Sequence, residues 1–183
     1  LFLFSATPAL KKDMGVEGTP PTPREVRKLG VLGAGFMGAG ITSIAVQQGT
    51  LVRLKDTDHA RVGKGLAAVR EVLQERLKKK QITRLQYDDM MIMAGGTTDY
   101  QGFRSVDLVI EAVFEDLTLK HTVLREVEPQ LAAQAIYASN TSTIPIARIA
   151  EVATRPERVL GMHFFSPVHK MPLLEVIVTP ATG

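Results

Sequence analysis

The sequence predicts an α/β fold in which a mostly parallel sheet carries helices on both faces, a doubly wound arrangement. Two observations predict it. From Lys28 onward, short apolar runs alternate with stretches of helical periodicity, which is the pattern of parallel strands joined by crossover helices. The first apolar run also leads directly into three closely spaced glycines. With 183 residues, of which 45% are hydrophobic and 22% charged, the chain can form a domain that buries about 70% of its unfolded surface.

The glycines Gly33, Gly35 and Gly38 follow a strand predicted at 28–32 with G-x-G-x-x-G spacing. In this motif the first glycine permits a tight turn, the second lets the backbone approach a pyrophosphate, and the third lets the next helix pack on the strand. The helix predicted at 36–48 would offer its free amides and positive end to the phosphates. The spacing alone also fits an ordinary glycine-rich bend. Its position between a strand and a helix favours a Rossmann-type dinucleotide site.

The second predicted strand, 51–55, ends at Asp56, which lies 23 residues after Gly33. A carboxylate at this position can accept hydrogen bonds from both hydroxyls of an adenosine ribose, and it would repel a 2′-phosphate. The expected cofactor is therefore NAD and not NADP. An alternative is that Asp56 or Asp58 only caps the helix predicted at 60–80.

Basic residues lie on both sides of this predicted site. Arg53 and Lys55 could hold a 2′-phosphate, but strand alternation turns them away from the face of Leu54, and we discount them. The helix predicted at 60–80 ends in a basic cluster, which fits a solvated helix terminus that complements the dipole. An anionic ligand is the alternative for this cluster, whose members are Arg76, Lys78, Lys79 and Lys80.

Composition limits the classes of function. A formal net charge of +3 gives no reason to expect nucleic acid or an acidic membrane as partner. The absence of Cys excludes disulfide frameworks, thiolate catalysis and Cys-ligated metal, and it fits a reducing compartment such as the cytoplasm. No apolar run approaches the roughly 18 residues that a membrane span needs. No metal site is expected.

The first part of the chain differs from the rest. Residues 1–27 begin with the apolar run 1–4 and continue into a stretch rich in Pro at 18–23, which cannot form a helix or a central strand. We interpret them as an arm and linker that followed a preceding domain, with a self-docking arm as the alternative. The domain proper is expected at 28–183.

The remaining elements follow from the same alternation. We expect a short helix that carries Ile146 and Ile149, and further strands at 92–94, 106–111, 135–139, 159–163 and 173–179. In an open α/β sheet ligands bind beyond the carboxyl ends of the strands. Polar residues follow three of these predicted ends, at Glu111, Ser139 and His163.

The run Ser139-Asn140-Thr141-Ser142 fits an N-cap for the short helix. Four such residues exceed what capping requires, so we expect Asn140 and Ser142 to reach into the crevice, where a hydroxyl can bond a substrate oxygen.

His163 ends a predicted strand, which places an imidazole at the mouth of the sheet. Period-two alternation puts Glu175 on the same face as Leu173 and Ile177, and a carboxylate on an apolar face needs a hydrogen-bond donor. His163 is the nearest candidate, and the acid would orient its ring. An edge strand with Glu175 facing water is an equal alternative. The histidines at 121 and 169 are expected to be ordinary surface residues.

Four motifs in this order resemble the NAD-binding domain of L-3-hydroxyacyl-CoA dehydrogenases. The resemblance covers about residues 28–183, and its Phe-Glu-Asp-Leu and Phe-Phe-Ser-Pro versions are most similar to the α subunit of the multifunctional fatty acid oxidation complex. The motifs are Gly33–Gly40, Glu111–Leu117, Ser139–Ser142, and His163–Pro167 followed by Glu175.

The resemblance implies roles for individual residues. His163 matches the catalytic base, Glu175 the acid paired with it, and Ser142 a hydroxyl that contacts the substrate oxygen. Lys79 matches a basic residue near the CoA phosphates. The implied cofactor-binding residues are Gly33, Gly35, Phe36, Met37, Gly38, Asp56, Glu115, Lys120, Asn140, Ser142 and Ser166.

Two positions depart from the family pattern. Ser166 stands where single-function enzymes have Asn, and Val72 stands where they have a Ser near CoA. The contacts that the family makes through that Asn amide and that Ser hydroxyl are therefore not carried over, whereas Ser166 itself stays among the implied cofactor-binding residues.

The function implied by the resemblance is NAD-dependent oxidation of L-3-hydroxyacyl-CoA in fatty acid β-oxidation. The implied partners are the acyl-CoA substrate, covalently linked hydratase and helical domains, and a thiolase subunit. Because the family's helical domain supplies a further catalytic Asn, we expect residues 1–183 alone to bind NAD but to turn over poorly. The alternatives are a related hydroxyacid dehydrogenase with a Lys-based site and a non-catalytic NAD-binding scaffold or sensor.

Overall fold

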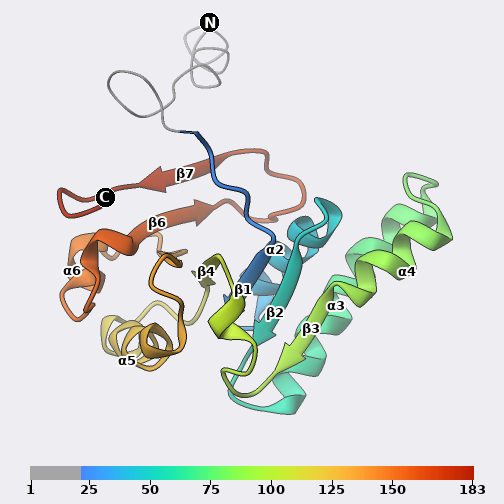
Figure 1. Cartoon of the computed structure of the whole chain (residues 1–183). Coiled ribbons are helices and arrows are strands. Elements are labelled where there is room, and N and C mark those ends of the chain that lie inside the picture. Colours follow the sequence, from blue (N-terminus) through green and yellow to red (C-terminus); the bar gives the residue numbers. More distant parts are fainter. Residues whose placement is uncertain (1–21) are drawn as a thin grey trace, which may run out of the picture.

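A computed structural model describes residues 22–183 as a seven-stranded sheet with helices packed against it (Figure 1). The strand order is β3-β2-β1-β4-β5-β6-β7. All neighbouring pairs are parallel except β6 and β7, which are antiparallel. The predicted doubly wound, mostly parallel fold is thus confirmed. The strands are β1 (Lys28–Leu32), β2 (Leu51–Lys55), β3 (Ala94–Thr97), β4 (Leu108–Glu111), β5 (Ile136–Ser139), β6 (Val159–Phe164) and β7 (Leu174–Ile177).

Helices cover both faces of the sheet, and each face has its own apolar core. One core surrounds Val31 and Leu54, and the other surrounds Phe103 and Val109. Figure 1 shows α3 and α4 at the β3 end of the molecule and α5 and α6 at the other end. The helices are α2 (Phe36–Gln47), α3 (His59–Lys78), α4 (Arg84–Ile92), α5 (Leu117–Val127) and α6 (Ile146–Ala150), with 3₁₀ turns η1 (Phe103–Ser105), η2 (Glu128–Gln130) and η3 (Pro156–Arg158).

The strand predicted at 92–94 is wrong. Ile92 is the last residue of α4, a helix that begins at a capping box formed by Thr83 and Gln86. The strand starts two residues later and contains Gly95 and Gly96, which have little intrinsic preference for strands. A Cβ at Gly96 would lie 2.4 Å from a methyl carbon of Val62. Close packing of α3 on β3 therefore excludes the side chains by which the strand could have been recognised.

Other boundaries differ by a few residues. The helix predicted at 60–80 ends at Lys78, and Lys80 adopts a positive φ of 56° that stops it. Helix α5, which Asp116 caps, is not among the predicted elements. The strand predicted at 173–179 is only four residues long. It lies at the sheet edge, where Val176 is 60% exposed.

The predicted arm and linker fall mostly on residues outside the described part of the chain. The last of them, 22–27, are extended and exposed, and lead into β1 at Lys28. Arg24 donates to the carbonyl of Gln134, and the amide of Arg27 donates to Asp107. Within residues 22–183 no helix has the length and apolar character needed to span a membrane.

The topology determines where a ligand can bind. β1 pairs with β2 on one side and with β4 on the other, so the connection leaving β3 crosses over to the opposite half of the sheet. Strand order reverses at this point, and the loops that follow β1 and β4 separate to leave a crevice. The predicted dinucleotide-binding turn lies there, directly after β1.

Candidate active site

The glycine-rich turn has the geometry that its spacing predicts. Gly33 has a φ of 98°, and a Cβ there would lie 2.6 Å from the carbonyl oxygen of Ala112. A Cβ at Gly38 would lie 1.8 Å from the carbonyl oxygen of Gly33. Above Gly35, in contrast, a Cβ would meet nothing within 4 Å. The first and third glycines are needed for packing, whereas the second leaves open space over the backbone.

Helix α2 begins at this open space without a side-chain cap. Gly35 is its N-cap residue, and no side chain accepts a hydrogen bond from the amides of the first turn. Phe36, the first helical residue, is 69% exposed. Unpaired amides at a helix N-terminus attract an anion. The residues present therefore fit a pyrophosphate.

A cavity of about 360 Å³ adjoins the turn. Gly33, Gly35 and Asp56 line one part of it, and α5 lines the opposite wall. One oxygen of Asp56 accepts from the amide of Ala34 at 2.7 Å, which fixes the carboxylate at the cavity surface. The capping alternative applies to the other acid, since Asp58 is the N-cap of α3. The other oxygen of Asp56 accepts from the amide of Thr57 at 2.7 Å and lies 3.9 Å from the Arg61 guanidinium, so the carboxylate lines the cavity with both oxygens already bonded.

The position of Lys55 differs from the one expected from the sequence. Strand alternation was expected to turn it out of the site, but Lys55 lines this cavity, with its ammonium 4.4 Å from the centre of the Tyr100 ring. The alternation argument fails because Lys55 is the last residue of β2 and lies at the mouth of the sheet. Arg53, farther back along the strand, does not line this cavity.

A second cavity, of about 310 Å³, contains most of the remaining predicted residues. It shares Ala112 and Val113 with the first cavity, so the two cavities adjoin along the segment that follows β4. Its wall is formed by the start of α2, the loops after β4 and β5, and the end of β6 with the loop that follows. The predicted site residues that line it are Met37, Glu115, Asn140, Ser142, His163 and Ser166.

Glu115 ties two of these segments together. Its Oε1 accepts hydrogen bonds from Thr141 Oγ1 at 2.5 Å, from the amide of Ser142 at 3.0 Å and from the amide of Thr143 at 3.1 Å. Burial raises the pKa of the Glu115 carboxyl, but these hydrogen bonds and the charge of Lys120 outweigh burial and lower the pKa to about 2. The ionised carboxylate holds the Ser142 loop against the end of β4.

A buried ion pair lies beneath Glu115. The Lys120 ammonium is 2.8 Å from Glu111 Oε1 and 3.2 Å from Glu115 Oε2. The side chains of Lys120 and Glu111 are 1% and 0% exposed. Ser139 donates to the second oxygen of Glu111 at 2.7 Å. Lys120, expected at the cofactor, therefore lies below the crevice wall and acts on the crevice through Glu115.

His163 and Glu175 meet as directly paired residues of β6 and β7. His163 Nδ1 lies 2.8 Å from Glu175 Oε2, so the pairing inferred from the sequence forms. The apolar-face argument for it does not hold, because Glu175 is 52% exposed and its neighbours Leu173 and Ile177 are also exposed. Both alternatives describe part of the result: Glu175 is on an edge strand, and it binds His163.

Three other predicted residues have different surroundings. The side-chain oxygen of Asn140 accepts from the amide of Phe164 at 2.9 Å, which joins the ends of β5 and β6. The Ser166 hydroxyl lies 3.6 Å from the sulfur of Met37. Lys79 pairs with Glu75 one turn earlier in α3 and lines neither cavity of the crevice.

The structure adds residues that the sequence analysis did not assign. Glu111 appeared only as a polar residue at a strand end, although a carboxylate that ends an apolar strand is itself a signal of a buried ion pair. Tyr100 and Glu126 complete the far wall of the first cavity. Their local sequence contains no pattern that distinguishes them from ordinary surface residues.

Comparison with known proteins identifies the relatives of this chain. The family described as 3-hydroxyacyl-CoA dehydrogenase, NAD binding domain matches residues 28–183. The fatty acid oxidation complex subunit alpha of Shewanella sp. (strain W3-18-1) is 44% identical over 182 residues, 99% of this chain and 26% of that protein. The Shewanella oneidensis protein of the same description is 42% identical over the same share of this chain. The chain thus spans about a quarter of the length of these curated relatives.

Solved structures agree with this relationship. The 3-hydroxybutyryl-CoA dehydrogenase of Escherichia coli superposes with a TM-score of 0.84 at 32% identity, covering 87% of this chain and 34% of that one. The (S)-3-hydroxybutyryl-CoA dehydrogenase of Ralstonia eutropha gives 0.83 at 37% identity, covering 86% and 56%. The expected resemblance and the NAD cofactor are confirmed. The chain belongs to the family of 3-hydroxyacyl-CoA dehydrogenase NAD-binding domains.

Proposed function

We propose that this chain is the cofactor-binding part of an enzyme that oxidises L-3-hydroxyacyl-CoA to 3-ketoacyl-CoA with NAD. The observation that supports this most strongly is the pair of adjoining cavities that form the crevice, of which one is lined by the glycine turn and Asp56 and the other by His163. A dinucleotide in this crevice would place its adenosine half in the first cavity and its nicotinamide half in the second. When bound, NAD supplies the hydride acceptor.

His163 is the proposed base. Because its Nδ1 is paired with Glu175, the second ring nitrogen, Nε2, is free to accept the proton of the 3-hydroxyl group as hydride leaves the same carbon. Glu175 fixes the ring orientation and compensates the positive charge that the ring acquires. A scaffold that only binds the dinucleotide does not require such a pair beside the cofactor, and the pair differs from a Lys-based hydroxyacid site.

Ser142 and Asn140 would orient the reacting groups. Ser142 lines the same cavity as His163, and its amide is held by Glu115, so its hydroxyl has a fixed position from which to bond the substrate oxygen. Asn140 uses its oxygen to hold the β6 end, which leaves its amide nitrogen for the nicotinamide. Lys79, outside both cavities, is proposed for the CoA phosphates alone.

The wider context comes from the relatives. Their name, fatty acid oxidation complex subunit alpha, supports a place in β-oxidation and covalent linkage to further domains. We propose hydratase and helical domains in the same polypeptide, a thiolase as partner subunit, and a cytoplasmic location. The proposed boundary between the linker and the NAD-binding domain is at residues 27 and 28.

Mutation of the base tests the proposal. The enzyme would be assayed with this chain joined to the other domains that its relatives contain. His163→Ala should lower kcat by about 10²- to 10⁴-fold and leave the Kd for NAD within about threefold, since the general base makes its contribution during proton transfer. An unchanged kcat would contradict the assignment. Lys170→Ala, at an exposed position on the following loop, provides the matched control and should keep full activity.

A further inference from the structure

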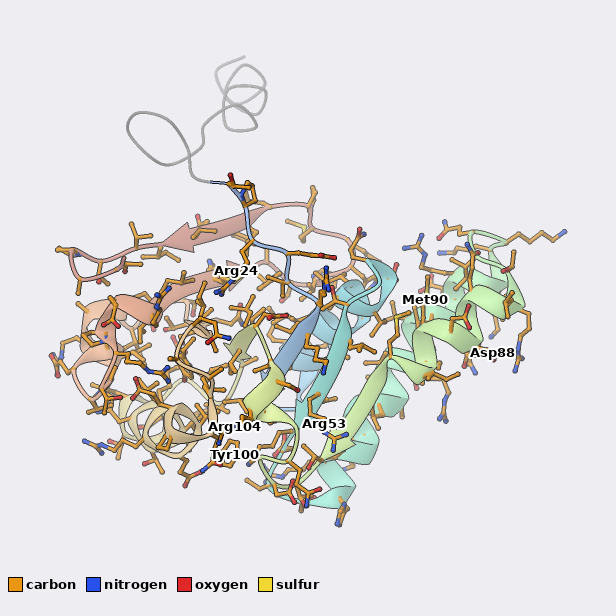
Figure 2. All side chains as sticks on the ribbon, viewed as in Figure 1. Arg24, Arg53, Asp88, Met90, Tyr100 and Arg104 are labelled. Atoms are coloured by element: carbon orange, nitrogen blue, oxygen red, sulfur yellow. The ribbon has the colours of Figure 1, made fainter. Side chains whose placement is uncertain are left out.

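The first cavity extends beyond Asp56 to a wall with no assigned role. This wall combines Lys55 at the end of β2, Tyr100 in the segment after β3, and Glu126 near the end of α5. Figure 2 labels Tyr100 in the lower part of the view, close to Arg104. Leu119, Thr122 and Val123 of α5 also line the cavity.

The Tyr100 side chain is held from three directions. Its hydroxyl donates to Glu126 Oε2 at 2.9 Å. Its ring packs edge to face on Phe103, with centroids 5.5 Å apart, and Phe103 is fully buried. The Lys55 ammonium lies over the ring. Tyr100 therefore joins β2, the β3 loop and α5 into one wall and fixes Glu126 at the cavity rim.

Tyr100 uses only one of the two carboxylate oxygens of Glu126. Burial, followed by the hydrogen bond to Glu126, raises the pKa of the Tyr100 phenol, so the phenol stays protonated and keeps Oε2 as its acceptor. Within residues 22–183, no donor lies within hydrogen-bond distance of Glu126 Oε1. Glu126 is an exposed residue at the cavity rim, and its Oε1 has free lone pairs in a cavity that a cationic donor, Lys55, also lines.

The position of this wall indicates which part of the dinucleotide reaches it. If the turn at Gly35 holds the pyrophosphate and Asp56 holds the ribose, then the base attached to that ribose must occupy the remainder of the cavity. Leu119 and Val123 offer apolar contact to the faces of a purine. An edge of adenine presents an exocyclic amine that donates and ring nitrogens that accept, which matches the acceptor on Glu126 and the donor on Lys55.

We propose that Glu126, positioned by Tyr100, reads the exocyclic amine of the base and makes the site selective for adenine over hypoxanthine dinucleotides. This inference rests on the proposed placement of NAD in the crevice. Hypoxanthine carries a carbonyl oxygen in place of the amine, and its neighbouring ring nitrogen carries a proton. The hydrogen-bonding pattern is therefore reversed, and an oxygen would face the Glu126 carboxylate without a donor between them.

Calorimetric titration of residues 1–183 with NAD and with nicotinamide hypoxanthine dinucleotide tests the proposal. The wild-type chain should bind the hypoxanthine analogue about tenfold more weakly than NAD, as expected when a hydrogen bond to a charged group is lost. In Glu126→Gln, the amide can turn to present either its oxygen or its nitrogen. The ratio of the two Kd values should then approach one.

A second variant separates positioning from direct contact. Tyr100→Phe keeps the ring that packs on Phe103 but releases the Glu126 carboxylate, so the ratio should fall to roughly threefold with the melting temperature little changed. The control is Glu71→Gln, which removes an exposed charge from α3, outside the cavity. This control should keep the wild-type ratio.

Three outcomes would overturn the inference. Equal affinity of the wild-type chain for both dinucleotides would exclude base selectivity, although NAD binding would then still support the proposed function. A tenfold ratio that persists in Glu126→Gln would assign the selectivity to another group. Failure of the wild-type chain to bind either dinucleotide would contradict the proposed placement of NAD together with this inference.

Discussion

The two ends of the crevice are built differently. In the first cavity, which we propose for the adenosine half, the glycine turn and Asp56 come from the first strand-helix-strand segment, and backbone geometry determines most of the shape. In the second cavity, which we propose for the nicotinamide half, residues from the start of α2, from the loops after β4 and β5, and from the end of β6 converge. They are held by the Glu111, Lys120 and Glu115 network and by one pair on an exposed edge strand.

This difference indicates what each end depends on. A turn fixed by steric exclusion keeps its shape as long as its glycines remain. A site assembled by charged side chains keeps its shape only while every charge is compensated, because an unpaired buried charge is expensive. We therefore expect two kinds of substitution. Those at the glycine turn should weaken NAD binding without unfolding the chain, whereas those in the charged network should disrupt the site because they destabilise the fold.

We expect removal of the buried Lys120 ammonium to lower the stability of the fold more than any other proposed substitution. In Lys120→Met, the side chain of Glu111 stays fully buried with no cation beside it, and the free energy of unfolding should fall by about 3–5 kcal/mol. Urea denaturation of the purified chain measures this. The double variant Lys120→Met with Glu111→Gln is the control, since removing both charges should cost less than removing one. A double variant less stable than the single one would contradict the ion-pair account.

A methyl group at Gly35, the second glycine of the turn, should weaken NAD binding without destabilising the fold. In Gly35→Ala the new Cβ meets no protein atom within 4 Å, but it occupies the space assigned to the pyrophosphate. The Kd for NAD should rise about thirtyfold, with an unfolding free energy within about 1 kcal/mol of wild type. Gly63→Ala, at another position with open space, should stabilise α3 and leave NAD binding intact. Normal binding by Gly35→Ala would place the phosphates elsewhere.

We expect low pH to destabilise the second cavity before it affects the first. The pKa of Glu115 is held at about 2, below its ordinary 4.5, so its ionised form stabilises the fold fully above pH 4.5. That contribution is lost as the pH falls from 4.5 toward 2. Because the side chain is about one third exposed, the loss should be about 1–2 kcal/mol. Glu115→Gln should flatten the pH dependence in this window, and an equal slope in both proteins would argue against the network.

The smallest expected effect concerns cofactor choice. Asp56→Asn keeps an acceptor for the amide of Ala34 but removes the negative charge. The Kd for NAD should rise about fivefold, and NADP should bind better than it does to the wild-type chain because its 2′-phosphate is no longer repelled. Parallel titrations with both dinucleotides measure the ratio. The same preference in both proteins would remove Asp56 from the ribose site.

The contrast between a turn built from one local segment and a cavity built from distant segments also explains how much of the site could be predicted from the sequence. The turn, the strand that leads into it and Asp56 are local features, because the chemistry of a pyrophosphate and a ribose determines both residue type and spacing. The pairing of His163 with Glu175 was one of two equal alternatives on residues alone. The family resemblance supported it, and the register of β6 and β7 produces it.

The parts that sequence reasoning missed depend on contacts between distant segments. β3 was missed because α3 packs so closely on it that Gly96 has no room for a side chain. The long side chain of Lys120 reaches from α5 to the buried carboxylate of Glu111, a contact that the sequence analysis did not assign. The far wall of the first cavity joins residues of β2, the β3 loop and α5, which no local pattern connects.

The most direct test of the account is calorimetric titration of residues 1–183 with NAD and NADP at neutral pH. If the crevice beyond β1 and β4 holds the dinucleotide with its adenosine ribose at Asp56, NAD should bind in a one-to-one ratio and NADP should bind at least about tenfold more weakly. No measurable binding of NAD, or tighter binding of NADP, would contradict it.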